Sequence, residues 1–125
     1  MPIYKDISWK TYDLKNPDTS LYAGYSGFVS YNKNLGLLHV SIFAQGDNKT
    51  GSDGVLIAVL PDDIKALVKK TFRARQGAMS PVASAAYAMY LELRPGGYIY
   101  AVTVTGNPPL YRITYDVCFP VNLLQ

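Results

Sequence analysis

The strongest constraint on the fold lies in residues 85–117, where short segments of alternating apolar and polar residues are separated by turn residues. The segments are AAYAMYLEL, YIYAVTVT and LYRITYDV, and the residues between them are RPGG and GNPP. A period of two places one face of each strand in a core and the other in water. Pro-Gly-Gly and Asn-Pro-Pro end strands and reverse the chain. The pattern therefore predicts antiparallel β-structure.

Upstream segments continue this pattern. Residues 26–33 form a predicted strand, an Asn-Lys-Asn turn follows, and GLLHVSIFAQ forms the next strand with Leu38, Val40 and Ile42 on the expected core face. The apolar run VLIAVL at 55–60 is typical of a strand that is covered on both faces. Roughly six to eight strands with such turn spacing are typical of a sandwich or barrel. We therefore expect residues 1–125 to form a single all-β domain, an antiparallel β-sandwich or barrel-like fold.

One short helix is predicted near residues 62–70. Asp62 and Asp63 occupy positions suited to an N-cap, and apolar residues follow them at helical spacing. These apolar residues are Ile64, Leu67, Val68 and Phe72. A helix of about two to four turns fits the pattern. An irregular segment that crosses the end of a sandwich fits it as well.

Two segments are expected to lack regular structure. Residues 1–24 show no clear period, and we expect an extended N-terminal segment that packs on the sheet or on a neighbouring subunit. The single tryptophan, Trp9, is expected to anchor this segment together with nearby apolar side chains. The polar sequence GDNKTGSDG at 46–54 is predicted to be a loop between strands.

The composition limits the classes of function. The chain contains eleven tyrosines and carries a net charge of +3. Charged residues make up 17% of the chain, whereas about a quarter is usual for a small domain. A surface poor in charge and rich in tyrosine suggests that a partner subunit or a ligand covers part of it. The weak positive charge comes without a recognisable motif, which argues against nucleic-acid binding.

Cysteine usage and the N-terminal residues bear on the compartment. Cys118 is the only cysteine and stands in the apolar run DVCFPV, so we expect a buried, reduced thiol. Lys5, Asp6 and Lys10 interrupt any apolar stretch at the start, and no secretion signal is expected. The longest apolar runs are too short to cross a bilayer. These features favour folding in a reducing cytoplasm without membrane insertion.

Catalytic and metal sites find little support in the sequence. His39 is the only histidine, and neither a nucleophile–base pair nor a zinc site can be assembled from the residues around it. No glycine-rich phosphate loop is recognisable. Glycoside cleavage needs only two carboxylates across a cleft. The acids available for this role are Asp47, Asp53, Asp62, Asp63, Glu92 and Asp116. We predict a protein without catalytic residues, metal or cofactor, and keep a small glycan hydrolase as an alternative.

Saccharide binding requires fewer specific residues than catalysis or metal binding does. It requires an aromatic ring for the apolar side of a pyranose and planar polar groups for its hydroxyls. Arg94, Arg112, His39 and Glu92 could supply the polar groups. The tyrosines on adjacent predicted strands are Tyr87, Tyr90, Tyr98, Tyr100, Tyr111 and Tyr115. The alternative interpretation is that these tyrosines pair across strands and bury their rings.

The predicted binding residues follow from the positions of turns, because turns at one end of a sandwich are open to ligands. Tyr98, Tyr100 and Arg94 flank the RPGG turn, and Asp47 and Asn48 begin the polar loop. These five residues are predicted to bind ligand. His39 is a further candidate.

The order of the segments resembles the head or tip domains of bacteriophage receptor-binding proteins in tail fibres and baseplates. Such heads begin with a tryptophan-containing stretch, here ISWKTYDLKN, and a strand, a turn and a second strand, here GFVSYNKNLGLLHVSI. An apolar strand that ends in Leu-Pro follows, here VLIAVLPDD. The domain closes with strands around a glycine turn and an aromatic strand, here YLELRPGGYIYAVTV and LYRITYDVCFPV. The resemblance is one of layout and covers most of residues 7–121.

The resemblance implies a non-enzymatic β-sandwich head that assembles as a homotrimer on the virion, at the tail tip or baseplate, after synthesis in the host cytoplasm. It implies a host cell-surface receptor, such as a cell-wall saccharide, and contacts with other tail or baseplate proteins. A structural or accessory virion subunit is the alternative. Members of the family carry a longer N-terminal neck, and the predicted helix near 62–70 is not expected there. These departures fit attachment through another baseplate protein.

Overall fold

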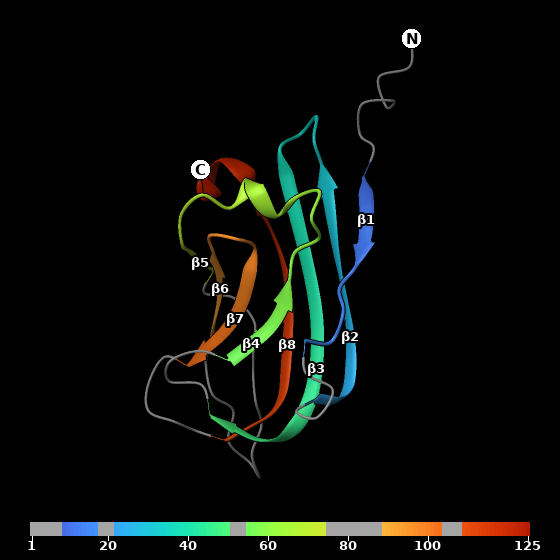
Figure 1. The fold of residues 1–125 in the computed structure, drawn as a ribbon, viewed down its shortest axis with the longest axis vertical. Helices are drawn as coiled ribbons and strands as arrows, with labels where there is room; N and C mark the ends of the chain where they lie inside the picture. Colours follow the sequence, from blue (N-terminus) through green and yellow to red (C-terminus); the bar gives the residue numbers. More distant parts are fainter. Residues whose placement is uncertain (1–8, 18–21, 51–54, 75–88, 104–108) are drawn as a thin grey trace.

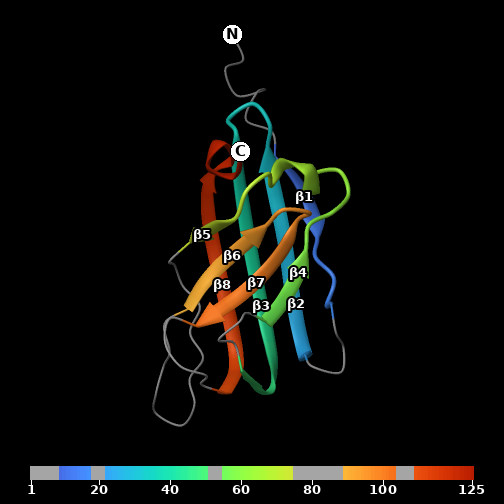
Figure 2. The ribbon, with the colours of Figure 1, turned by 60° about the vertical axis from the view of Figure 1, so that its left-hand side comes forward.

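Two antiparallel sheets pack face to face in the computed structural model, which describes residues 9–17, 22–50, 55–74, 89–103 and 109–125 (Figure 1). Sheet A has the strand order β1-β2-β3-β8, and sheet B has the order β4-β7-β6-β5. Figure 2 shows sheet B lying across sheet A. The predicted all-β sandwich is confirmed.

Strands β2, β3 and β8 of sheet A are longer than any strand of sheet B, whereas β1 is short. Sheet A consists of β1 (Lys10–Asp13), β2 (Tyr22–Asn32), β3 (Leu37–Thr50) and β8 (Pro109–Pro120). Sheet B consists of β4 (Val55–Val59), β5 (Phe72–Ala74), β6 (Met89–Arg94) and β7 (Tyr98–Thr103). Two short 3-10 turns, η1 (Lys65–Leu67) and η2 (Val121–Leu124), complete the described elements.

The core lies between the two sheets and follows from the period of two along each strand. Leu38, Val40 and Ile42 of β3 are at most 1% exposed, so their predicted core face is confirmed. Leu91 and Leu93 of β6 meet them from sheet B and are fully buried. Every second residue is buried in β3 from Leu38 to Ala44 and in β8 from Ile113 to Phe119, and the residues between them belong to the outer face of sheet A.

Two tyrosines of sheet A connect it to the main chain of sheet B. The Tyr25 hydroxyl donates a hydrogen bond to the Ile57 carbonyl over 2.6 Å, at a bulge where the register of β4 and β7 shifts. The Tyr115 hydroxyl donates to the Tyr90 carbonyl. Burial raises the pKa of Tyr25 to about 12 and also raises that of Tyr115. Both hydroxyls thus stay protonated and available as donors at neutral pH.

The predicted helix near 62–70 is reduced to a single 3-10 turn, η1. The backbone N–H groups of Lys69 and Lys70 donate to the Leu124 carbonyl, over 2.7 and 3.2 Å. These bonds draw the chain toward the C-terminal turn η2 and away from a further helical turn. Ile64 and Val68 are still buried. The apolar residues at this spacing therefore belong to an irregular segment that covers the end of the sandwich.

The two aspartates that were predicted to cap this helix have other partners. Ile64 precedes η1, and no side chain caps the turn. Asp62 pairs with Lys65 over 3.0 Å, and Asp63 pairs with Lys10 of β1 over 3.5 Å. The aspartates therefore join η1 to its surroundings through side-chain contacts and do not begin a helix.

Strand β4 was predicted to be covered on both faces, and this is wrong. Ile57 and Ala58 are buried, but Val59 is 40% exposed. The strand lies at the edge of sheet B, next to β7. A bulge between Leu56 and Ala58 turns two consecutive side chains, Ile57 and Ala58, toward the core. Two neighbouring apolar residues are therefore buried although only one face of the strand is covered.

The prediction of a buried thiol at Cys118 is also wrong. Cys118 is exposed, whereas its neighbours Val117 and Phe119 in β8 are buried. Successive side chains of a strand point to opposite faces, so Cys118, between two buried residues, points to the outer face. The apolar residues around Cys118 in the sequence therefore do not predict whether the cysteine itself is buried.

The N-terminal segment pairs with the edge of sheet A. Residues 10–13 form β1 beside β2, and the Leu14 N–H donates to the Gly27 carbonyl over 2.9 Å. Leu14 is buried, but Trp9 is 41% exposed. Leu14, and not the tryptophan, therefore anchors the described part of this segment.

The turns β2–β3 and β6–β7 lie at the same end of the sandwich as η1 and η2, which we call the upper end (Figure 1). The Val121 N–H donates to the Gly36 carbonyl, and the Leu60 N–H donates to the Gly97 carbonyl, each over 2.8 Å. Gly97 has a φ of +84°, and a Cβ there would lie 2.7 Å from the Lys65 Cβ. Only glycine fits this close approach.

Within the described residues, no helix has the length and apolar character needed to cross a membrane.

Candidate functional site

Six side chains form a cluster on the outer face of sheet B, which we call the sheet B patch. Its members are Arg73, Tyr90, Glu92, Arg94, Tyr98 and Tyr100. In the register of the sheet, Glu92 lies opposite Arg73 of β5 and Tyr100 of β7. Arg94 lies opposite Tyr98, directly beside the β6–β7 turn. Short strands and a tight turn therefore bring arginines, tyrosines and one acid onto a single surface.

Glu92 is the centre of the sheet B patch. Arg73 Nε lies 2.5 Å from one carboxylate oxygen of Glu92, and Arg94 Nε lies 2.6 Å from the other. The Glu92 side chain is only 5% exposed, whereas those of Arg73 and Arg94 are 60% and 34% exposed. The arginines thus cover the acid and present their own charge to solvent.

The charge state of Glu92 follows from these contacts. Burial alone would raise the pKa of Glu92, but the hydrogen bonds from Arg94 and Arg73 outweigh it and lower the pKa. The carboxylate therefore stays ionised at neutral pH. One negative charge between two positive charges leaves the cluster with a net charge of +1.

The aromatic rings of the patch differ in how open they are. The Arg94 guanidinium lies 3.7 Å from the centre of the Tyr100 ring, and that of Arg73 lies 5.6 Å from the Tyr90 ring. Tyr98 is 45% exposed. A Cβ at Gly96 would lie 2.8 Å from the Tyr98 ring, so the glycine lets this ring rest on the turn. Tyr98 therefore presents an open aromatic surface beside fixed guanidinium donors.

This arrangement suits binding better than proton transfer. A carboxylate that is held by two guanidiniums with a lowered pKa is a poor proton donor at neutral pH. Asp116, another described acid, lies on the outer face of the opposite sheet, next to His39. The described residues contain no group of three or more His, Cys, Asp or Glu side chains that could hold a metal ion.

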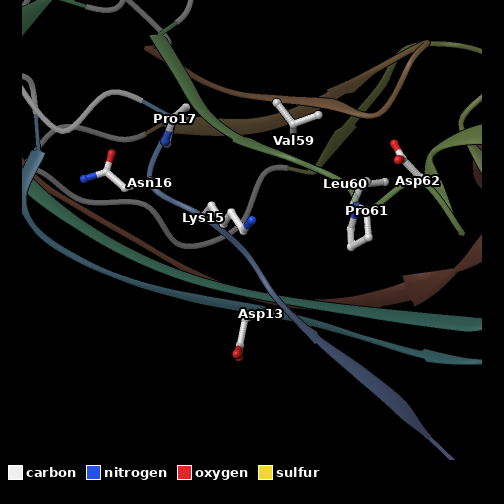
Figure 3. A pocket seen from close by; sticks show the side chains of 8 residues that line it. All are labelled: Asp13, Lys15, Asn16, Pro17, Val59, Leu60, Pro61 and Asp62. Atoms are coloured by element: carbon white, nitrogen blue, oxygen red, sulfur yellow. The ribbon is translucent and has the colours of Figure 1, made fainter.

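The groove shown in Figure 3 does not supply paired acids either. This cavity of about 390 Å³ lies between the segment after β1 and the end of β4. The carboxylates of Asp13 and Asp62, which line it, point away from each other in Figure 3. Glycoside cleavage requires two carboxyl groups that face one sugar bond, so the groove offers no support for the hydrolase alternative.

The six residues predicted to bind ligand lie in three different places. Arg94, Tyr98 and Tyr100 come together in the sheet B patch. His39 lies on the outer face of sheet A, where it contacts Asp116 and meets the Phe28 ring edge-on at 5.4 Å. His39 therefore lies on the opposite face of the sandwich from the sheet B patch.

The predicted loop at 46–54 begins later than expected. Strand β3 continues to Thr50, so the backbone of Asp47 and Asn48 belongs to this strand. The two residues lie at a register shift between β3 and β8, at the end of β3 remote from the upper end (Figure 1). Their side chains lie outside the described part of the chain. Their backbone is thus separated from the β6–β7 turn by the length of the sandwich.

Arg73 was missed as a member of the site. In the sequence it stands among basic residues of a predicted helix and loop, and its pairing with Glu92 joins two segments far apart in the chain. One signal was available. Glu92 occurs within the apolar strand YLELR, and an acid in such a strand requires nearby counter-charges. This requirement predicts that further cationic side chains lie next to Glu92, but it does not identify Arg73 as one of them.

Comparisons with known proteins give no family for this chain. No family model matches the sequence, and no curated protein or solved structure matches it significantly. The function therefore has to be inferred from the geometry of the sheet B patch.

Proposed function

We propose that the chain is a non-enzymatic receptor-binding head domain of a phage tail or baseplate, which binds a saccharide of the host cell surface through the sheet B patch. The layout of the sequence supports the class of protein. The single observation that carries the binding role is the open ring of Tyr98, 45% exposed, beside guanidiniums that Glu92 holds in place. Assembly as a homotrimer on the virion is part of the proposal.

The chemistry of the patch suits a saccharide. A pyranose has one apolar face, which packs on an aromatic ring, and hydroxyls that need directional hydrogen-bond partners. Tyr98 provides the ring. Arg73 and Arg94 use their Nε groups on Glu92, which fixes the plane of each guanidinium. Donors that are already held in place lose less conformational entropy when a ligand binds.

A structural or accessory virion subunit is the second candidate, and the outer face of sheet A favours it. Phe28 and Phe43 lie on this face, and Phe43 is 36% exposed. The small polar residues Ser41 and Thr114 are cross-strand neighbours of Asp116 and Phe43. A sheet face with apolar rings and few charges among its described side chains suits contact with another virion protein.

Two exposed aromatic residues, one on each outer face, test the proposal. Tyr98→Ala is expected to weaken binding to host cell-wall polysaccharide by ~1–3 kcal/mol, because it removes the stacking surface. The control is Phe43→Ala, which removes a ring of similar exposure from the other sheet and is expected to leave binding unchanged. Isothermal titration calorimetry with purified polysaccharide provides both affinities. Equal affinities for Tyr98→Ala and the wild type would overturn the assignment of the patch.

Solution mass separates the two candidates further. A receptor-binding head is expected to sediment at about three times the chain mass of 13.8 kDa and to bind intact host cells. A monomer that binds neither cells nor their polysaccharides would remove the proposal. A sheet B patch that is fully covered by a neighbouring protein in the assembled particle would favour the structural subunit.

A further inference from the structure

A second pocket lies at the upper end, between the β1–β2 edge of sheet A and the η1 segment. Its volume is about 580 Å³, which is within the range of small-ligand sites. We call it the η1 pocket. Its lining residues are Lys10, Tyr12, Tyr31, Lys33, Asn34, Asp63, Ile64 and Leu67. None of them belongs to the sheet B patch.

The floor of the η1 pocket is aromatic and apolar. Tyr12 and Tyr31 are half-buried and pack against the hydrophobic core. Ile64 is 2% exposed and closes the side formed by the η1 segment. Aromatic rings with one wet edge, next to aliphatic side chains, form a surface on which a sugar ring can lie. These side chains therefore suit a ligand whose ring has one apolar face.

The rim of the η1 pocket carries positive charge. Lys10 lies opposite Tyr31 in the register of β1 and β2, and its Nζ is 5.1 Å from the centre of the Tyr12 ring. The same Nζ lies 3.5 Å from an Asp63 oxygen, which also accepts a hydrogen bond from the Tyr12 hydroxyl at 3.5 Å. Asp63 thus offsets the charge of Lys10.

Lys33 is the second cation of the rim. It has no ion-pair partner among the residues that the structure describes, and its side chain is exposed. With Lys10 balanced by Asp63, the charge of Lys33 leaves the η1 pocket positive. A positive pocket attracts an acidic ligand and repels a basic one.

We propose that the η1 pocket binds an acidic sugar of the uronic-acid type, with its ring on Tyr12 and Tyr31 and its carboxylate toward Lys33. The aromatic floor accounts for the sugar ring. The unbalanced lysine accounts for the acid. This site is separate from the sheet B patch, so it neither requires the proposed receptor function nor follows from it.

The test is a titration of the full chain, with backbone amide chemical shifts followed by NMR. The probes are glucuronate, glucose and inorganic phosphate at equal ionic strength. Glucuronate is expected to shift amides of β1, the β2–β3 turn and the η1 segment, whereas glucose and phosphate bind at least tenfold more weakly. No binding of glucuronate, equal binding of glucose, or equal binding of phosphate would each overturn the proposal.

A matched pair of lysine variants tests the role of the charge. Lys33→Gln is expected to weaken glucuronate binding by about threefold to fivefold, since it removes the unbalanced but solvent-exposed cation. The control is Lys65→Gln, which makes the same charge change on η1 at a lysine outside the pocket lining and paired with Asp62. Equal effects of the two variants would contradict the proposal. Tyr98→Ala is expected to leave glucuronate binding unchanged, which separates this site from the sheet B patch.

Discussion

Sheet A and sheet B share one core, but they hold charge on their outer faces in different ways. On sheet A, His39 and Asp116 form a pair whose side chains are 31% and 73% exposed. On sheet B, Glu92 is 5% exposed and is held by two arginines. A solvated pair contributes little to stability or shape, whereas a covered carboxylate fixes the groups around it. Fixed donors beside an open ring make sheet B the better candidate for recognition.

The two hairpin turns at the upper end differ in a similar way. Gly36, in the β2–β3 turn of sheet A, has a φ of +65° and no atom within 4 Å of where a Cβ would lie. Gly97, in the β6–β7 turn of sheet B, has a φ of +84° and packs directly against Lys65 and Leu60. The turn of sheet A has space for a Cβ at Gly36, whereas the turn beside the sheet B patch has none at Gly97.

Replacing the two turn glycines gives the largest expected difference between the sheets. Gly97→Ala is expected to reduce the free energy of unfolding by about 3 kcal/mol, because strain at positive φ adds to a clash with the Lys65 backbone. Gly36→Ala is expected to reduce it by about 1 kcal/mol from the positive φ alone. Urea unfolding of both variants measures the two values. Equal losses would show that the packing of the β6–β7 turn does not matter.

The tyrosines that connect the sheets give the next largest effect. Tyr115→Phe is expected to reduce the free energy of unfolding by about 2 kcal/mol, because the Tyr90 carbonyl is left without this donor in the core. Tyr25→Phe is expected to cost about 1 kcal/mol, since Tyr25 is only half-buried. Thermal unfolding of the two variants orders them. A larger loss for Tyr25→Phe would show that the β2–β4 side couples the sheets more strongly than the β8–β6 side.

The charged groups of the two outer faces give the smallest effect, and it depends on pH. The folded-state pKa of Glu92 is lowered from 4.5, so its stabilising contribution is present above that pH and is lost as the pH falls through the folded value. Glu92→Gln is expected to cost about 1.5 kcal/mol at pH 7, and the difference from the wild type is expected to shrink in acid.

The matched control for Glu92 is Asp116→Asn on sheet A, at an exposed acid. Its expected effect on the free energy of unfolding is below about 0.5 kcal/mol. Unfolding curves at several pH values from neutral to acid provide the comparison. A pH-independent loss for Glu92→Gln, or a loss of the same size for Asp116→Asn, would remove the distinction between the two faces.

Local sequence pattern was sufficient for much of the fold. The core face of β3, the strands on either side of the RPGG turn and the all-β class follow from period-two alternation and turn residues, which act between close neighbours in the chain. The same alternation places Arg94, Tyr98 and Tyr100 on one face, because a tight turn sets the register of its two strands. These three residues are the part of the site that sequence could predict.

Errors arose where distant segments decide the outcome. The apolar spacing after Pro61 also fits a helix. The backbone N–H groups of Lys69 and Lys70 instead donate hydrogen bonds to the Leu124 carbonyl, so the chain does not continue as a helix. The strand at 55–60 has a fully apolar sequence, but its position at the edge of sheet B leaves Val59 exposed. Neither the bonds to the C-terminus nor the order of strands in a sheet can be read from a local pattern.

The sequence by itself determined which residues alternate, where the chain turns and which side chains of a hairpin share a face, because these properties depend on the geometry of neighbouring residues. Tertiary structure decided that Arg73 joins Arg94 on Glu92, that two tyrosines bridge the sheets and that a pocket forms beside η1. Each of these features brings together residues more than fifteen positions apart in the chain. Their contacts exist only because burial of a shared core fixes the strand order, and that order is a property of the whole chain.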